Sequence, residues 1–505
     1  MTVSFNNIPA DVRVPLFYAE MDNSAANTAQ DNAPSLLFGM ALPDSEIAAN
    51  ELVIMPSADL AGKLAGRGSQ LARMVAAYRK VDPFGELWVI ALPDGSGTAA
   101  KGTVTLSGTA TAAGSISLYI GTTRVQAVVA TEDKAKAVAT TLAAAINARP
   151  DLPVKAEVLA TSGGDVQGVV TLTAVNKGVS GNDIPLAVNY YGSVGGEEVP
   201  AGLTAQIGVM KGGAGSPDMA PAVAAMGDAP FDYIGLPFSD MPSLQLMAME
   251  MNDSSGRWSY MRQLYGHVYT AKVGDLSELV AFGDGLNNQH ITVAGYEPDC
   301  QTPLDELVAG RLARAAVFLR IDPARPTQTG ELTGAMPAPV GKRFIMTEQQ
   351  SLLTHGIATA YAEGGSLRIQ RDITTYKKNA YGVADNSYLD SETLHTSAYV
   401  LRRLKSVITS KYGRHKLAND GTRFGPGQAI VTPAVIRGEL CATYRQLERE
   451  GIVENFELFQ KYLIVERNAN DPSRLDVLFP PDYVNQLRVF ALLNQFRLQY
   501  NEEAA

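Results

Sequence analysis

Cysteine is nearly absent from this 505-residue chain, which has only Cys300 and Cys441. Two thiols are too few for a disulfide framework and are compatible with a reducing compartment. The sequence also lacks any run of 18 apolar residues free of charge, and its start carries neither a basic nor an apolar leader segment. These absences predict a protein that is made in a cytoplasm and stays there until something releases it, with no direct membrane insertion.

Basic residues are fewer than acidic residues in this chain. The chain has 42 Lys and Arg against 52 Asp and Glu, a formal net charge of −10 and a pI near 5.2. Proteins that bind nucleic acids usually gather Lys and Arg on one face, so DNA and RNA are not expected as partners. With 46% apolar and 19% charged residues, the composition is that of a globular protein, and the length allows roughly three domains of ordinary size.

Several short motifs suggest chemistry but lack the residues that the chemistry needs. Glu392 and His395 form one ExxH pair, whereas a di-iron bundle needs a second pair and further carboxylates. THGIATA, around His355, resembles the histidine segment of subtilisin-like proteases, but no GTSMA-like or GxSxG nucleophile segment accompanies it. KGGAG, residues 211–215, lacks the Lys-Ser/Thr of a phosphate loop. Because the five histidines also lack metal-ligand spacing, we expect no catalytic residue, no cofactor and no metal.

Both ends of the chain have strand-like patterns. Near the N-terminus the alternating residues are Val12, Val14, Leu16 and Tyr18, and Pro15 restricts such a strand to a sheet edge. Residues 487–500 place apolar side chains on both faces at period two. The residues that define this second strand are Leu487, Val489, Phe490, Leu492, Phe496, Leu498 and Tyr500. A strand of this kind must be buried on both faces, and the pattern leaves open whether its partners belong to this molecule or to the next one.

A composition break marks an insertion at residues 98–211. It lies between the turn-rich segments PDGSG and GGAGSPD, which are joints of the kind that tolerate domain insertion. The inserted stretch has no Phe, Trp, Cys or His and is rich in Val, Thr, Ala and Gly. Its short alternating runs predict a small sandwich or barrel, interrupted by one Ala-rich helix. We interpret this unit as a surface appendage.

The segments on either side of the insertion alternate helices with strands. Helices are expected at 68–81, 218–226, 240–252, 275–283 and 303–319, and strands at 86–92, 231–237, 266–271 and 290–295. This alternation is typical of a parallel sheet covered on both faces. A third region begins near residue 377 with two long amphipathic helices and continues with strands at 461–467 and 474–480, which indicates an α+β domain.

Five segments, in order, resemble the sheath proteins of contractile phage tails, and most closely those of Mu-like phages. They are IPADVRVPLFYAEMDNS, GRGSQLARMVAAYRK followed by ELWVIAL, GTVTLSGTATAAGSISLYIGTTRVQ, LLTHGIATAYAEGGSLRIQRDITTY and LIVERNANDPSRLDVLFPPDYVNQLRVFALLNQFRLQY. None of the five is diagnostic alone, but five in the same order are a specific signal. The resemblance covers nearly the whole chain.

This resemblance implies a multidomain fold, α/β plus α+β, whose α/β core is subtilisin-like in topology and not proteolytic. The expected division is an N-terminal arm (1–25), an α/β core (26–97 and 212–376), an inserted β-rich outer domain (98–211), a C-terminal α+β domain facing the tail tube (377–484) and a C-terminal strand or arm (485–505). The strand residues at both ends would then join neighbouring subunits.

The resemblance also implies a structural subunit and no enzyme. Six copies would form a ring, rings would stack helically around a tail tube, and the lattice would contract to drive the tube through the host envelope. The expected partners are further copies of the chain, the tail tube protein, and the baseplate and tail terminator proteins. The expected location is the virion tail, after assembly in the host bacterial cytoplasm.

Arg402, Arg403 and Lys405 lie largely off the apolar stripe of their helix and are candidate contacts with the tube. A solvated helix face explains them at least as well. Three other interpretations of the whole chain stay open. The chain could belong to a pyocin-like contractile particle, which is the same class of protein, or to a tail tube, which its length and α/β core disfavour. An α/β hydrolase is favoured by the core and opposed by the missing nucleophile and base.

Overall fold

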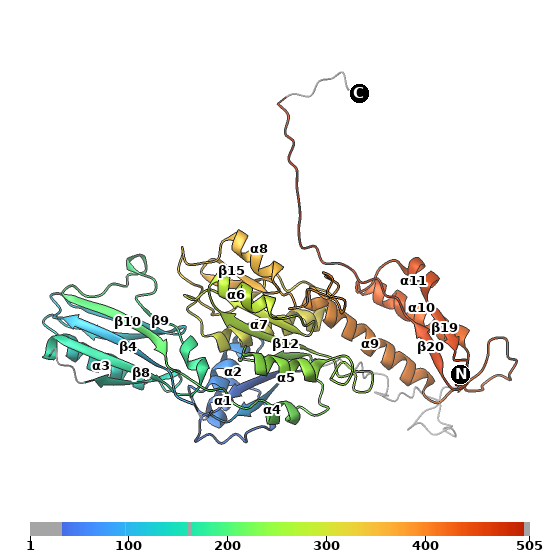
Figure 1. The fold of residues 1–505 in the computed structure, drawn as a ribbon, viewed down its shortest axis with the longest axis horizontal. Coiled ribbons are helices and arrows are strands. Elements are labelled where there is room, and N and C mark those ends of the chain that lie inside the picture. Colours follow the sequence, from blue (N-terminus) through green and yellow to red (C-terminus); the bar gives the residue numbers. More distant parts are fainter. Residues whose placement is uncertain (1–32, 96, 160–163, 499–505) are drawn as a thin grey trace, which may run out of the picture.

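The computed structural model describes residues 33–95, 97–159 and 164–498. The predicted strand residues Val12, Val14, Leu16 and Tyr18, and Tyr500 at the other end, lie outside these ranges. Figure 1 shows an elongated molecule, in which the inserted domain and the C-terminal domain lie at opposite ends of a central α/β domain. In the described part of the chain, no helix has the length and apolar character needed to cross a bilayer.

The central domain is built on a six-stranded sheet in the order β13-β12-β11-β1-β3-β2. Its strands are β1 (Ser35–Met40), β2 (Leu52–Ile54), β3 (Leu87–Leu92), β11 (Tyr233–Gly235), β12 (His267–Val273) and β13 (Ile291–Tyr296). All neighbouring pairs are parallel except β2 with β3, at one edge. The parallel sheet that the alternation predicted is thus confirmed, although β1, its fully buried central strand, was not among the predicted elements.

Helices cover both faces of this sheet. One face packs against α1 (Ala58–Ala65), α2 (Gln70–Val81) and α7 (Leu304–Ile321), and the other against α4 (Ala220–Ala225), α5 (Met241–Met251), α6 (Leu276–Asp284) and α8 (Met346–Thr354). Side chains of β1 alternate between the two cores, since Leu37 joins the first and Phe38 the second. Gly39 lets α2 approach closely, because a Cβ there would lie 2.9 Å from Leu71 Cα. A small antiparallel sheet, β14 (Glu331–Leu332), β16 (Ser366–Arg371) and β15 (Thr359–Glu363), adjoins α7 and β13.

The inserted domain is a sandwich of two antiparallel sheets with one helix. One sheet has the order β10-β4-β8-β7 and the other β6-β5-β9. The elements are β4 (Lys101–Gly108), β5 (Gly114–Ile120), β6 (Thr123–Val129), α3 (Ala135–Asn147), β7 (Val154–Leu159), β8 (Gln167–Ala174), β9 (Leu186–Val188) and β10 (Leu203–Lys211). Their inward-facing Val, Leu, Ile and Ala side chains form a core separate from that of the central domain.

This domain is held to the central domain by more than its two joints. Gln301 Nε2 donates to the carbonyl of Gly121 at 2.9 Å, and the Tyr190 hydroxyl donates to the carbonyl of Pro337 at 2.7 Å. At the joints themselves, the backbones of Thr98 and Ala214 are paired by two hydrogen bonds of 3.0 and 3.1 Å. The chain therefore enters and leaves the insertion at adjacent points.

The C-terminal domain contains α9 (Ser391–Tyr412), α10 (Pro433–Arg449), α11 (Phe456–Tyr462) and two short strand pairs. The pairs are β17 (Lys416–Leu417) with β18 (Ile430–Val431), and β19 (Ile464–Arg467) with β20 (Leu475–Leu478). The Tyr444 and Phe459 rings stack at 3.7 Å in its core. The strand predicted at 461–467 is too long by its first residues, because α11 continues to Tyr462 and carries Phe459 into this core.

Because the insertion begins and ends at paired backbones, we expect the central domain to fold without it. Replacing residues 99–213 by a short Gly/Ser linker should give a soluble chain with cooperative thermal unfolding, since all six strands of the central sheet lie outside the replaced stretch. Circular dichroism melts test folding, and electron microscopy tests whether tubes still form. The matched control is Asn176→Ala in the full chain, which removes only the hydrogen bonds of the Asn176 side chain to the central domain. Aggregation of the shortened chain beside a soluble Asn176→Ala variant would contradict the expectation.

Candidate functional site: the interdomain cleft and the C-terminal arm

The edge of the central sheet where α/β enzymes bind ligands is filled by the inserted domain. In such sheets, ligands bind beyond the carboxyl ends of the strands, where the strand order reverses, which here is beside β1. At that end, Gln70 Oε1 accepts from the Met40 N–H at 3.1 Å, and the Gln70 N–H donates to Asn176 Oδ1 at 2.9 Å. Asn176 Nδ2 donates in turn to the Ala41 carbonyl at 3.1 Å. Both side chains are buried, so the inserted domain covers the edge at this point.

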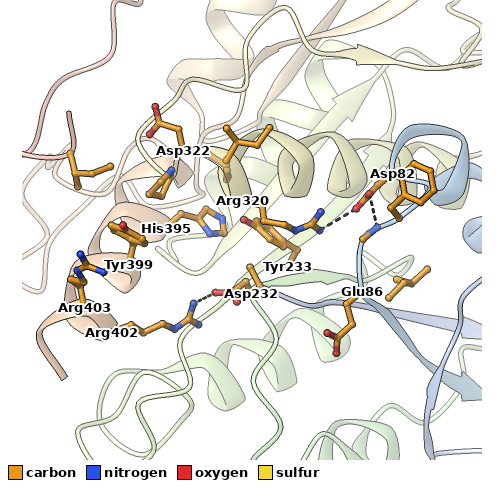
Figure 2. A pocket seen from close by; sticks show the side chains of 18 of the residues that line it. Asp82, Glu86, Asp232, Tyr233, Arg320, Asp322, His395, Tyr399, Arg402 and Arg403 are labelled. Carbon is orange, nitrogen blue, oxygen red and sulfur yellow. Dashed lines mark hydrogen bonds and ion pairs between the residues drawn. The ribbon is translucent and has the colours of Figure 1, made fainter. Parts of the chain in front are cut away.

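The opposite edge carries a cleft of about 1860 Å³ between the central domain and α9 (Figure 2). It opens at the amino ends of β1, β3 and β11, where Ala33, Leu87 and Tyr233 line it. Figure 2 shows two of its ion pairs, Arg320 with Asp82 at 3.1 Å and Arg402 with Asp232 at 2.6 Å. These charges neutralise each other within the chain.

Beneath the cleft, a buried cluster of aromatic and imidazole rings joins α9 to the sheet. His395 stacks on Tyr233 with 5.0 Å between ring centroids, and its Nε2 lies 3.0 Å from the Tyr269 hydroxyl. The His267 ring lies 5.7 Å from that of His395, and His267 Nε2 is hydrogen-bonded to Thr292 at 2.8 Å. Burial, with a smaller contribution from the Arg402 charge, lowers the pKa of His395 to about 3. Burial also holds the pKa of His267 well below its usual value.

The ExxH pair and the THGIATA histidine take structural positions. His395 points into the ring cluster, whereas Glu392 accepts from the backbone and hydroxyl of Thr327, both at 2.9 Å. His355 Nδ1 lies 2.7 Å from the Ser351 carbonyl, and its Nε2 lies 4.0 Å from Asp284. Across residues 33–498, apart from the short gaps, no three His, Cys, Asp or Glu side chains gather as a metal site requires. Neither motif assembles catalytic geometry.

The three predicted tube contacts lie at different depths on α9. Arg402 makes contacts within its own subunit. It pairs with Asp232, donates to the Leu264 carbonyl at 3.3 Å and lies over the Tyr265 ring. Arg403 lies 3.6 Å from Glu450 and is partly exposed. Lys405 is exposed at the cleft rim. Contact of these residues with a tube stays a prediction, and Arg402 would have to leave Asp232 to take part.

The C-terminal strand-like segment forms no strand in the isolated chain. It leaves the junction of the central and C-terminal domains and extends away from both (Figure 1). From Val489 to Leu498, every large apolar side chain is at least 76% exposed. We call residues 489–498 the C-terminal arm. Such a run of exposed apolar side chains is typical of a surface that another molecule covers.

The buried histidines predict a pH dependence of stability. Unfolded His395 and His267 take up protons near pH 6.5, whereas the folded groups stay neutral well below that value. Above pH 6.5 these groups are neutral in both states, and as the pH falls below that value each lowers the free energy of unfolding by about 1.4 kcal/mol per pH unit, for His395 down to its folded pKa of about 3. Thermal melts between pH 7 and 4 should show a steeper loss for the native chain than for His395→Phe. Parallel pH profiles of the two proteins would contradict this account.

Comparisons with known proteins agree with this non-catalytic geometry. Three family models match the chain: a phage tail sheath protein β-sandwich domain at residues 95–204, a phage tail sheath protein central domain at 212–375 and a phage tail sheath C-terminal domain at 383–497. The Mu-like prophage FluMu tail sheath protein of Haemophilus influenzae is 40% identical over 502 residues, 99% of this chain and 100% of that protein.

One solved structure shows a related fold. The crystal structure of a sheath tail protein from Desulfitobacterium hafniense matches with a TM-score of 0.50 at 11% identity, covering 94% of this chain and 97% of that one. A sheath tail protein from Listeria innocua matches with a TM-score of 0.47 at 11% identity, covering 90% and 92%. The hydrolase interpretation is excluded, because the matching family is structural. The chain belongs to the phage tail sheath proteins, is of the Mu-like type, and is a non-enzymatic structural component of the virion tail.

Proposed function

We propose that this chain forms hexameric rings that stack helically around a tail tube, and that the lattice contracts to drive the tube through the host envelope. The observation that carries the proposal is the C-terminal arm, whose apolar side chains have no cover in the single subunit. A contact that does not close on itself generates a helical assembly. Donated strands suit such a lattice, because main-chain hydrogen bonds can persist while rigid bodies move.

The arm's receiver is the β19–β20 hairpin of a neighbouring subunit. This hairpin is a two-stranded sheet in the described chain, so each strand has an outer edge that can accept another strand. Ile464 and Leu478, opposite each other, are 49% and 57% exposed. Two strands alone are marginally stable, and a third strand with apolar side chains would cover this face. The ten arm residues span roughly 33 Å when extended, enough to reach across a gap between subunits.

The strand residues near the N-terminus, Val12, Val14, Leu16 and Tyr18, belong to the same proposal as a second donated strand. Contraction would then draw on energy stored at assembly, since two packings of rigid subunits suffice for a two-state lattice. The core would share the topology of subtilisin-like α/β proteins without their chemistry. The remaining partners would be the tail tube, baseplate and tail terminator proteins, with assembly in the host bacterial cytoplasm. A pyocin-like particle is the alternative setting for the same subunit.

Disrupting the arm should abolish assembly and leave folding intact. A chain that ends after Val489 should be soluble, melt cooperatively and form neither rings nor tubes, because every described residue that it loses is exposed. The variant Val14→Asp with Leu16→Asp should show the same assembly defect. Size-exclusion chromatography and negative-stain electron microscopy measure the outcome.

Phe490→Asp with Leu492→Asp removes the arm's apolar character at full length. Its matched control is Val128→Asp with Val209→Asp, which changes two comparably exposed residues of the inserted domain. Tubes from the arm variant, or aggregation of the shortened chain, would show that the arm does not join subunits.

The tube contact is proposed for Arg403 and Lys405, which keep exposed positions on α9. Reversing both to Glu should abolish assembly on co-expressed tubes and leave the melting temperature within a few degrees of the native value. Arg402 is left unchanged, because its reversal would place two negative charges together beside Asp232. Arg414→Glu with Lys416→Glu is the control on the same domain. Normal sheathed tubes from the Arg403 and Lys405 variant would assign both residues to solvent.

A further inference from the structure

The arm begins at a buried ionic site. Arg488, the residue before the arm, has a side chain only 11% exposed, whereas Val489 is 78% exposed. Arg488 Nη2 lies 3.1 Å from both Asp390 Oδ1 and Glu392 Oε2, and its Nη1 donates to Gln328 Oε1 at 3.2 Å. Leu487, on the other side of Arg488, is also 72% exposed, so Arg488 is the last largely buried side chain before the arm.

The two preceding residues are held by the same part of the molecule. Gln486 Nε2 donates to the Ala324 carbonyl at 3.1 Å, and Gln328 Nε2 donates to the Leu487 carbonyl at 3.3 Å. Ala324 and Gln328 lie in the segment that follows α7, and Asp390 directly precedes α9. Three successive residues at the base of the arm are thus tied to the junction between the central and C-terminal domains.

Charges at this junction balance when Arg488 is present. Three carboxylates, Asp372, Asp390 and Glu392, face three guanidinium groups, Arg311, Arg371 and Arg488. Arg311 pairs with Asp372 at 2.6 Å, and Arg371 holds Asp390 through two hydrogen bonds of 2.8 and 2.9 Å. Burial raises the pKa of Glu392, and the Arg488 charge opposes that rise. Without Arg488, a fully buried carboxylate would lose its paired cation.

The Asp390 side chain contacts the residue before the arm and does not cap its own helix. It occupies the N-cap position of α9, where an Asp side chain normally accepts from the first turn of the helix. It makes no such hydrogen bond and instead bridges Arg371 and Arg488. Buried ion pairs add little stability compared with apolar packing, but they fix geometry at one residue. This geometry fixes where the arm leaves the subunit.

We propose that Asp390, Glu392 and Gln328 form an anchor for Arg488, which sets the position and direction of the C-terminal arm and ties a neighbour bound to that arm to the junction of α7 and α9. Arg488 is thus a positioning residue for assembly. The inference rests on the proposed joining role of the arm, and its test must separate the two.

The test compares Arg488→Met with the double variant Arg488→Met and Glu392→Gln. The single variant should melt at a lower temperature, because it leaves a buried carboxylate unpaired. The double variant removes both charges and should recover most of the lost melting temperature. If Arg488 positions the arm, the double variant should still yield at least tenfold fewer ordered tubes than the native chain. Arg414→Met, an exposed position on the same domain, is the control and should match the native chain.

A spin label at Val489 reports the anchor in the unassembled subunit. It requires Val489→Cys in a chain with Cys441→Ala, since Cys300 is buried. The label should be restricted in the native background and become fast-moving in the double variant, whereas a label at Leu498 should move freely in both. Equal mobility at Val489 in both proteins would overturn the anchor.

The combined outcomes test the positioning role of Arg488 and the joining role of the arm separately. Native tube yield from a stable double variant would overturn the anchor and leave the joining role of the arm intact. Native tube yield from the chain ending after Val489 would overturn the joining role, while the label at Val489 would still decide whether Arg488 fixes the arm. An insoluble double variant would assign Arg488 to folding and would also contradict the proposal.

Discussion

An extended segment cannot pair its own backbone hydrogen-bonding groups, and residues 489–498 form no strand pair in the described part of the chain. The six large apolar side chains of the arm are exposed in the single subunit. Covering them would contribute roughly 9–18 kcal/mol before the cost of ordering the arm, at 1.5–3 kcal/mol for each side chain. The described subunit does not realise that gain, because these side chains are exposed in it. The contacts of Arg488 with Asp390, Glu392 and Gln328 hold the base of the arm.

Contacts within the chain tie the inserted domain and α9 to the central domain. The inserted domain fills the carboxyl edge of the central sheet through Gln70 and Asn176, and α9 is tied to the amino edge by His395 and Arg402. Contacts within the chain thus cover part of the carboxyl edge and link α9 to the central domain across the cleft at the amino edge. A displacement of one subunit would reach its neighbour through the arm without being absorbed inside the body. The absence of catalytic geometry and the presence of an exposed arm fit the same structural role.

Periodicity predicted the central domain well after residue 68, because helices and strands there alternate with clear amphipathic patterns. β1 was not predicted, since its six residues are all buried and show no period that distinguishes a strand from a buried helix segment. The start of β19 was predicted too early, at residue 461, because α11 and β19 adjoin without a polar break.

Sequence patterns could not predict the side-chain contacts between distant segments. Gln70 with Asn176, and Glu392 with Arg488, are each far apart in the chain, so no spacing rule relates them. One local signal existed for the anchor: Arg488 is the one charged residue in the apolar run 487–493. A charge in that position has to find a partner, and the structure shows it beside two carboxylates.

The most direct measurement is a cryo-electron microscopy map of tubes assembled from the native chain, at a resolution that traces the backbone. The account predicts that residues 489–498 pair as a strand with β19 or β20 of another subunit, while Arg488 stays between Asp390 and Glu392 of its own. A map in which these residues fold back onto their own subunit, with the hairpin edges of neighbours unoccupied, would contradict it.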